Sequence, residues 1–140
     1  MAKTVQSKLR GYSFQYAAKF ICTANIPGTS QTSDAVVPGS YQTAVNIHNP
    51  QTVKVRLRKK IASPIGISKY FDFVLEPDGV ARVTCAQIRE FGLHLIHGFE
   101  GFLVIESSHS VDVVAVYTAA GKDHVSSIDV EDVRERKLKR

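Results

Sequence analysis

The chain of 140 residues contains no tryptophan, one methionine, two cysteines and no long apolar run. Two cysteines cannot build the dense disulfide framework that holds many small secreted domains, so a hydrophobic core has to supply the stability. A membrane-spanning helix needs about 20 consecutive, mostly apolar residues, and no stretch approaches that length. The N-terminal segment is basic but lacks the apolar stretch that a secretory signal requires. We therefore expect a cytoplasmic protein without a membrane span.

The two cysteines, Cys22 and Cys85, lie in the contexts KFICT and RVTCA, within or at the end of apparent strands. In a reducing cytoplasm, such thiols act most often as small buried hydrophobic side chains. This is the interpretation that the sequence favours. A disulfide between them, or a role as metal ligands, stays open as an alternative.

Motifs that carry catalysis are also missing. Neither IPGTS nor TAAGKDH has the spacing of a phosphate-binding loop, and no G-x-S-x-G nucleophile motif occurs. Residues 107–110, SSHS, together with Asp112 contain the residue types of a serine hydrolase triad, but such triads are assembled from separate loops. His94, His97 and Glu100 repeat at three-residue spacing, yet the surrounding glycines predict a loop leading into a strand. The sequence thus predicts no catalytic residues, no metal site, no cofactor and no enzymatic activity.

What the sequence does contain is clearest at residues 41–61, YQTAVNIHNPQTVKVRLRKKI. Two stretches alternate apolar and polar residues, and the residues NPQT at 49–52 separate them, which predicts a β-hairpin or an arch between strands. Asparagine followed by proline suits a type I turn, in which the asparagine side chain bonds the backbone two residues further on. In the second stretch one face is apolar and is expected to be buried. That face consists of Val53, Val55, Leu57 and Ile61.

Further strands are expected at residues 16–23, 70–76, 80–85, 99–106, 111–119 and 126–133. Pro77-Asp78-Gly79 predicts a second hairpin, and the stretch after Thr84 predicts one short helix that ends at Gly92. Seven or eight short strands and almost no helix predict an all-β protein, a single-domain antiparallel β-sandwich or jelly roll. We divide the chain into a flexible basic arm at 1–13, the sandwich at 14–133 and a basic tail at 134–140.

The strand at residues 111–117, VDVVAVY, has apolar side chains on both faces. Such a strand belongs where neither face meets water. In a sandwich the partner sheet covers only the inner face, so we predict that a second subunit covers the outer one; a loop or the short helix is the alternative. The predicted oligomer interface consists of Val111, Val113, Val114, Val116 and Tyr117.

The net charge of +5 comes mainly from two segments, 54–60 and 134–140. In the first, alternate residues are cations about 7 Å apart on one strand face, a spacing that can follow consecutive phosphates. The alternative is a solvated face whose cations pair with acids of a neighbouring strand, for example Asp72 and Glu76. This alternative is favoured, because no aromatic platform is interleaved with the cations. The candidate polyanion face consists of Lys54, Arg56, Arg58 and Lys60.

Several stretches resemble a known group of proteins: YAAKFIC at 16–22, YQTAVNIHNP at 41–50, VDVVAVYTAAG at 111–121 and SIDVE at 127–131. Together they resemble a functionally uncharacterised family of small bacterial β-sandwich proteins, which brings no catalytic residues to this chain. The order NIHNPQTVKVRLRKK and then GFLVIESSHSVDVVAVYTA is also distantly similar to sensory rhodopsin transducer proteins. That resemblance implies a cytoplasmic, non-enzymatic β-sandwich that assembles as a homo-oligomer and works by binding partners.

These observations predict a non-enzymatic, self-associating structural or adaptor module that acts through protein–protein surfaces. One alternative is a sandwich that binds a carbohydrate or another small molecule, with Tyr41 and Tyr70 in place of the missing tryptophan. The other is binding of nucleic acid or another polyanion by the basic strand at residues 54–60.

Overall fold

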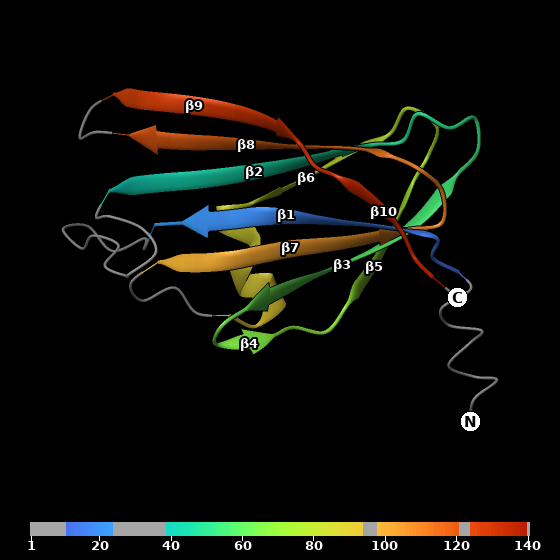
Figure 1. The fold of residues 1–140 in the computed structure, drawn as a ribbon, viewed down its shortest axis with the longest axis horizontal. Helices are drawn as coiled ribbons and strands as arrows, with labels where there is room; N and C mark the ends of the chain where they lie inside the picture. Colours follow the sequence, from blue (N-terminus) through green and yellow to red (C-terminus); the bar gives the residue numbers. More distant parts are fainter. Residues whose placement is uncertain (1–10, 24–38, 94–97, 121–123, 140) are drawn as a thin grey trace.

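The computed structural model describes residues 11–23, 39–93, 98–120 and 124–139, which form two packed antiparallel sheets (Figure 1). The strands within these residues are β1 (Phe14–Cys22), β2 (Ser40–His48), β3 (Val55–Ser63), β4 (Gly66–Ile67), β5 (Phe71–Leu75), β6 (Val80–Thr84), β7 (Phe99–Ser107), β8 (Asp112–Ala120), β9 (Val125–Asp132) and β10 (Glu135–Lys137). Sheet A has the order β10-β1-β7-β3-β4, with β5 also paired to β3, and sheet B has the order β6-β2-β8-β9. The predicted all-β, antiparallel sandwich is confirmed. No helix within the described ranges is long and apolar enough to cross a membrane.

Three connections cross from one sheet to the other at the same end of the sandwich, on the right in Figure 1. Residues 49–54 join β2 in sheet B to β3 in sheet A, so the arch rather than the hairpin forms there. The hairpin predicted at Pro77-Asp78-Gly79 is wrong, because β5 pairs with β3 while β6 pairs with β2. Both arches and hairpins need a sharp change of direction, here with Asp78 at φ 59°, so the turn residues do not distinguish them. The third crossing joins β7 to β8.

Asn49 holds the first two of these crossings together. Its side chain is completely buried, and its Oδ1 accepts a hydrogen bond from the Gln51 N–H at 2.8 Å, as the turn prediction required. Its Nδ2 lies 2.9 Å from the carbonyl of Val53 and 3.0 and 3.1 Å from the carbonyls of Leu75 and Glu76. A buried polar group is tolerated when it is bonded in this way, so Asn49 stabilises the arch-bearing end.

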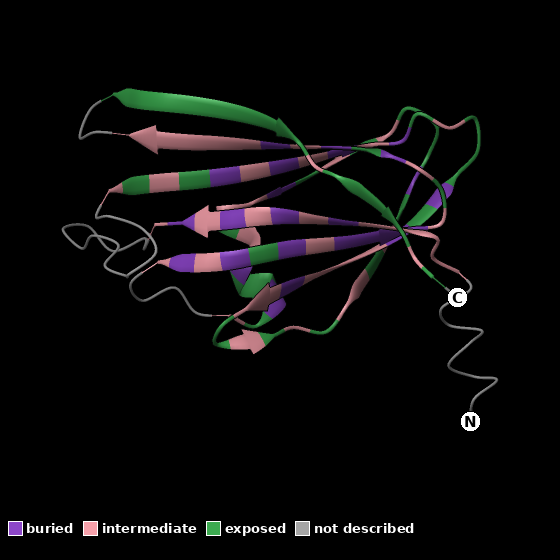
Figure 2. Cartoon of the chain, viewed as in Figure 1, coloured by how far each residue is buried: buried purple, intermediate pink, exposed green. Residues whose placement is uncertain are grey.

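The core lies between the sheets and follows the expected alternation, which Figure 2 shows as alternating colours along β1, β2 and β7. On β3, Val55, Leu57 and Ile61 are all fully buried. Val53 differs from the prediction, since it precedes β3 and is 49% exposed. Lys59 occupies the inward position between Leu57 and Ile61, where burial lowers the pKa of its ammonium group.

The short helix η1 (Cys85–Phe91) is a 3₁₀ helix that packs beside β6 and ends at Gly92, as predicted. Gly92 adopts φ 78°, and its N–H donates to the Arg89 carbonyl at 3.0 Å. This left-handed conformation carries little steric cost for glycine, so it terminates the helix. Phe91 is buried, and its ring meets Phe71 edge to face at 5.3 Å.

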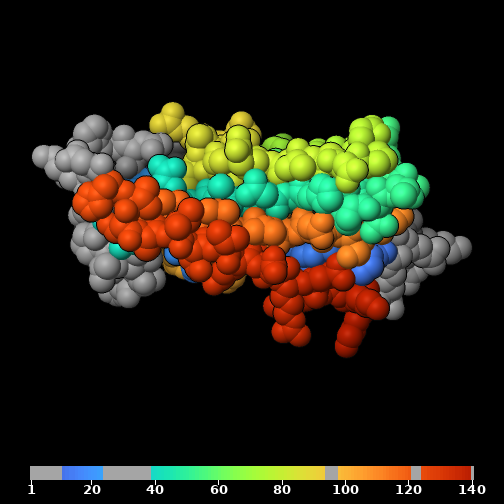
Figure 3. Space-filling view, turned by 90° about the horizontal axis from the view of Figure 1, so that it is seen from above, coloured from blue at the N-terminus to red at the C-terminus, as the bar shows by residue number. Residues whose placement is uncertain are grey.

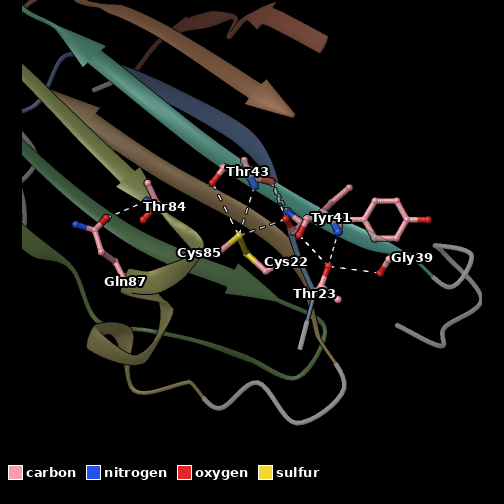
Figure 4. Close-up of a disulfide and its surroundings, with 9 residues drawn as sticks. Cys22, Thr23, Gly39, Tyr41, Thr43, Thr84, Cys85 and Gln87 are labelled. Carbon is pink, nitrogen blue, oxygen red and sulfur yellow. Dashed lines mark hydrogen bonds between the residues drawn. A yellow bond between two sulfur atoms is a disulfide. The ribbon is translucent and has the colours of Figure 1, made fainter. Parts of the chain in front are cut away.

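Cys22 and Cys85 form a disulfide, which corrects the interpretation of two buried free thiols (Figure 4). Cys22 ends β1 of sheet A and Cys85 begins η1 directly after β6 of sheet B, so the bond joins the two sheets. Their Cα atoms are 5.7 Å apart although 63 positions separate them in sequence. Beside the bond, Thr43 Oγ1 accepts from the Ile21 N–H at 2.9 Å and donates to the Ile21 carbonyl at 2.8 Å. Only the folded topology brings the two sulfurs together, so cysteine spacing alone could not reveal the pair.

The C-terminal strands β9 and β10 form one ribbon that passes from sheet B to sheet A. Residues 135–137, which lie in the predicted basic tail, pair with β1 as a strand. Tyr16 anchors this pairing, since its hydroxyl donates to Glu135 Oε1 at 2.5 Å and accepts from the Val111 N–H at 2.9 Å. Burial, and then the bond to Glu135, raise the pKa of Tyr16 to about 12. Residues 1–10 of the predicted arm lie outside the described residues.

Candidate interaction surfaces

The outward-facing side chains of sheet B form rows that run across its strands. The registers align Arg82-Asn46-Val114-Asp132 in one row, Thr84-Ala44-Val116-Val130 in the next and Val80-His48-Asp112 in a third. We call these rows, together with Ile128, the outer face of sheet B. Figure 3 looks onto this side, where the orange-red of β9 is followed by the orange of β8, the teal of β2 and the yellow-green of β6.

Of the five residues predicted to form an oligomer interface, only Val114 and Val116 lie on this face. Val111 and Val113 lie in the core, 5% and 4% exposed. Tyr117 points between the sheets, and its hydroxyl donates to a backbone carbonyl of β1 at 2.7 Å. Burial, and then the nearby acids of β9, raise the pKa of Tyr117 to about 12. Of the predicted interface residues, Val114 and Val116 therefore remain as candidates for contact with a second subunit.

Strand β9 extends the apolar surface that these valines begin. Val130 lies beside Val116 in the register, and Ile128 lies beside Thr118. Ile128 and Val130 are 66% and 62% exposed. The sequence predicted a strand at residues 126–133 but did not assign these two residues to a surface. Their alternation with acids was the available signal, but it does not reveal that β8 is the neighbouring strand.

At the opposite edge of the same face, the surface is hollowed beside β6. The hollow measures about 450 Å³ and is lined by Asn46, Val80, Arg82, Thr84 and Gln87. Gln87 is held in place because its Oε1 accepts the Thr84 N–H at 2.9 Å. Within the described residues, neither Arg82 nor Asp132, at the two ends of one row, makes an ion pair. At one edge of the face β9 thus carries exposed apolar side chains, and at the other edge lies a hollow lined mainly by polar residues.

His48 joins two acids at the arch-bearing end of this face. Its Nδ1 lies 2.8 Å from Asp112 Oδ2, and its Nε2 lies 3.1 Å from Asp78 Oδ1. The bond to Asp112, followed by the bond to Asp78, raises the pKa of His48 above its ordinary value. The imidazole therefore connects β2 to β8 and to the turn before β6. Asp112 is the acid of the residue set that resembles a serine hydrolase triad, and it binds His48 and not His109. His109 Nδ1 lies 2.9 Å from Ser108 Oγ.

The basic row lies on the outer face of sheet A, but two of its four cations are already paired. Arg56, Arg58 and Lys60 point outward from β3, while Lys54 precedes the strand. Arg58 Nε and NH2 lie 2.7 and 2.5 Å from Glu106 Oε1 on β7. Lys54 Nζ lies 3.3 Å from Glu76 Oε1, one of the pairings expected for a solvated strand face.

Aromatic rings also cover this row, which the sequence analysis had not anticipated. The Arg58 guanidinium lies 4.4 Å from the Tyr12 ring centre and 4.0 Å from that of Tyr70. Lys60 Nζ lies 4.5 Å from the same Tyr70 ring. Asp72 is the register neighbour of Arg58, as proposed, but it accepts a hydrogen bond from the Tyr12 hydroxyl at 3.3 Å. Tyr12 precedes β1 and Tyr70 precedes β5, so only the fold brings the two rings to β3.

Among residues 11–23, 39–93, 98–120 and 124–139, no three His, Cys, Asp or Glu side chains gather where they could hold a metal ion. His94 and His97 lie outside these ranges. Glu100, which follows them at the same spacing, forms an ion pair with Lys19 on the neighbouring strand.

No protein-family model matches the chain, and no curated protein matches it. Among solved structures it is similar to the crystal structure of Thermotoga maritima 1070, with a TM-score of 0.56 and 10% sequence identity. The match covers 85% of this chain and 92% of the other. At this identity the similarity extends to the fold alone.

Proposed function

We propose that the chain is a non-enzymatic, self-associating structural or adaptor module that acts through the outer face of sheet B. The observation that supports this proposal is the apolar strip formed by Val114, Val116, Ile128 and Val130. Ile128 and Val130 are more than 60% exposed, and they lie beside the two half-buried valines of β8. Contiguous exposed apolar patches on soluble proteins mark interaction sites more often than scattered apolar residues do.

Self-association through sheet B leaves the outer face of sheet A on the outside of the assembly. That face carries Arg56 and Lys60, for which no acid partner is found within the described residues. An assembly presents several copies of this face to one partner, and multivalency raises avidity by roughly 10² to 10⁴ without new contacts. This arrangement supports the proposed adaptor role.

Val114→Asp tests the proposal. A carboxylate in the apolar strip should dissociate the assembly, because an interface core disfavours an unpaired charge. The matched control is Val74→Asp, since Val74 is a 50% exposed valine on the outer face of sheet A. Sedimentation velocity should report an oligomer for wild type and for the control, and a monomer for Val114→Asp. If wild type sedimented only as a 15.4 kDa species even at about 100 μM, the proposal would be withdrawn.

The hollow beside β6 supports a second candidate, binding of a small polar molecule or a carbohydrate. It offers the Arg82 guanidinium and the amide groups of Asn46 and Gln87. Tyr70 is a poor stacking platform for a sugar, because Arg58 already covers its ring at 4.0 Å. A panel of sugars and small carboxylic acids in a thermal-shift assay tests this candidate, since a true ligand raises the melting temperature by mass action.

The third candidate, binding of nucleic acid or another polyanion, has less support than the sequence suggested. Arg58 is neutralised by Glu106, and Lys54 by Glu76, which leaves a shorter cationic row for phosphates. Binding to a nucleic acid that weakens steeply between about 50 and 200 mM salt would favour this function.

A cytoplasmic location stays a prediction from the sequence, and the disulfide argues against it. Disulfides persist mainly in oxidising compartments and are rare in the cytosol of mesophiles. Thiol trapping in intact cells, followed by mass spectrometry of Cys22 and Cys85, separates the two locations: a bridged pair favours an exported protein, and free thiols favour a cytoplasmic one.

A further inference from the structure

We infer that two copies of the chain pack face to face through the outer face of sheet B, around a two-fold axis that runs parallel to the strands between β2 and β8. This inference rests on the proposed self-association and specifies its partner, geometry and contacts. It follows from how charge and shape are distributed across the rows of that face.

A two-fold axis along the strands reverses the order of each row on the facing copy. In the strand order β6-β2-β8-β9, β6 then lies opposite β9 of the second copy, and β2 lies opposite β8. Arg82 and Asp132 occupy the two ends of one row, so each Arg82 faces Asp132 of the second copy. The symmetry produces this ion pair twice. Both side chains are exposed and have no ion-pair partner within the described part of their own chain.

The next row gives apolar contact under the same symmetry. Val116 faces Ala44 of the second copy, and Val130 faces Thr84 of the second copy. Thr84 lines the hollow of about 450 Å³ beside β6. The apolar β9 edge of one copy, where Val130 is 62% exposed, therefore meets the hollowed edge of the other. This symmetry therefore places an apolar residue over the hollow in addition to pairing the two charges.

Two other symmetric arrangements lack this complementarity. An axis perpendicular to the strands places β9 opposite β9 and β6 opposite β6 of the second copy, so Arg82 has no acid opposite it and Asp132 has no cation opposite it. Pairing of the free β9 edges would join the two sheets side by side instead. Asp129 and Glu131 point inward on that edge strand, which is a device that discourages edge pairing.

The size of the face predicts a weak, reversible dimer. Four strands about 4.8 Å apart, with a mean length near 25 Å, cover about 500 Å² on each copy. The pair then buries on the order of 1,000 Å², at the lower end of specific interfaces. We expect dissociation in the micromolar range and weakening by salt, because the ion pairs lie at the rim of the contact.

Complementary charge reversal tests the geometry. Arg82→Glu places like charges opposite Asp132, and Asp132→Arg places like charges opposite Arg82, so each variant alone should sediment as a monomer. A mixture of the two variants restores both ion pairs within a heterodimer. The two introduced charges, which are of opposite sign, face each other at one site, and the native pair of Arg82 with Asp132 forms at the other. We expect the mixture to dimerise at concentrations where each variant alone does not.

The controls carry the same charge changes away from the contact. Arg89→Glu lies on η1, and Glu131→Arg lies on β9 but points to the inner side of the sheet. Both should dimerise like wild type, and circular dichroism should show that every variant is folded. If wild type self-associates but the two face variants do so unchanged, or if their mixture stays monomeric, this geometry is refuted while self-association stands. If wild type is monomeric even at about 100 μM, well above the dissociation constant expected for a contact of this size, the proposed function itself fails.

Discussion

Reduction of the Cys22–Cys85 disulfide should remove a large part of the stability of the folded chain. The bond joins sheet A to sheet B and closes a loop with a sequence separation of 63. In the chain-entropy description, a cross-link restricts the unfolded chain more strongly as the closed loop becomes longer. For a loop of this length the expected stabilisation is about 4 kcal/mol at 25 °C.

The assay compares the free energy of unfolding in urea with and without a reductant such as tris(carboxyethyl)phosphine. We expect a loss of about 4 kcal/mol, which for a chain of this size corresponds to a fall of roughly 10 to 15 °C in melting temperature. The variant in which Cys22 and Cys85 are both replaced by alanine should be similarly destabilised. The reductant should leave that variant unchanged, which controls for any other effect of the reagent.

Two results would refute the reasoning. Quantitative alkylation of both cysteines in the unfolded, unreduced protein would show that the bond is absent. A stability difference below about 1 kcal/mol, with the bond shown to be intact beforehand, would show that the unfolded chain is not restricted as the loop length predicts.

Three further predictions concern single side chains. Asn49→Ala should lower the free energy of unfolding by about 3 kcal/mol in urea denaturation, because it leaves buried carbonyls unpaired. Glu106→Ala should lower the free energy of unfolding by about 3 kcal/mol in the same assay, because it leaves Arg58, whose side chain is only 18% exposed, without its carboxylate partner. An effect within experimental error would show that the tyrosine rings alone are enough to stabilise the Arg58 guanidinium. The difference in stability between wild type and His48→Gln should shrink as the pH rises. Because the pKa of His48 is raised in the folded state, the stabilisation by this histidine is complete below about pH 6.5 and is lost as the pH passes through the folded-state pKa. Equal differences at pH 5.5 and pH 8.5 in thermal melts would contradict this prediction.

Local patterns in the sequence predicted the layers of this fold but not their connections. Alternation on β3 placed Val55, Leu57 and Ile61 inside, and Gly92 ended the short helix as expected. The hairpin at Pro77-Asp78-Gly79 was wrong because turn chemistry reports a change of direction and carries no information about which strand becomes the neighbour. Strand partners are set by burial across the whole molecule, so a local pattern cannot specify them.

The candidate surface was predictable only in part for the same reason. Apolar side chains on both faces of residues 111–117 predicted an apolar outer side, and Val114 and Val116 lie there, both half-buried. Arg82 and Asp132 are 50 positions apart and become two ends of one row only through β2 and β8. Like the disulfide, this row is a product of topology and has no signature along the chain.

The place of β1 in sheet A sets a condition on how the molecule is made. Its neighbours on the two sides are β7 and β10, which begin at Phe99 and Glu135. As the chain emerges from the ribosome, β1 is therefore synthesised well before β7 and β10. Neither its ladder with β7 nor its ladder with β10 can form until those later strands have been made. During that interval, the apolar side of YAAKFIC is exposed and can form non-native contacts. We expect a chaperone that binds the nascent chain to bind this segment until residue 99 has been synthesised.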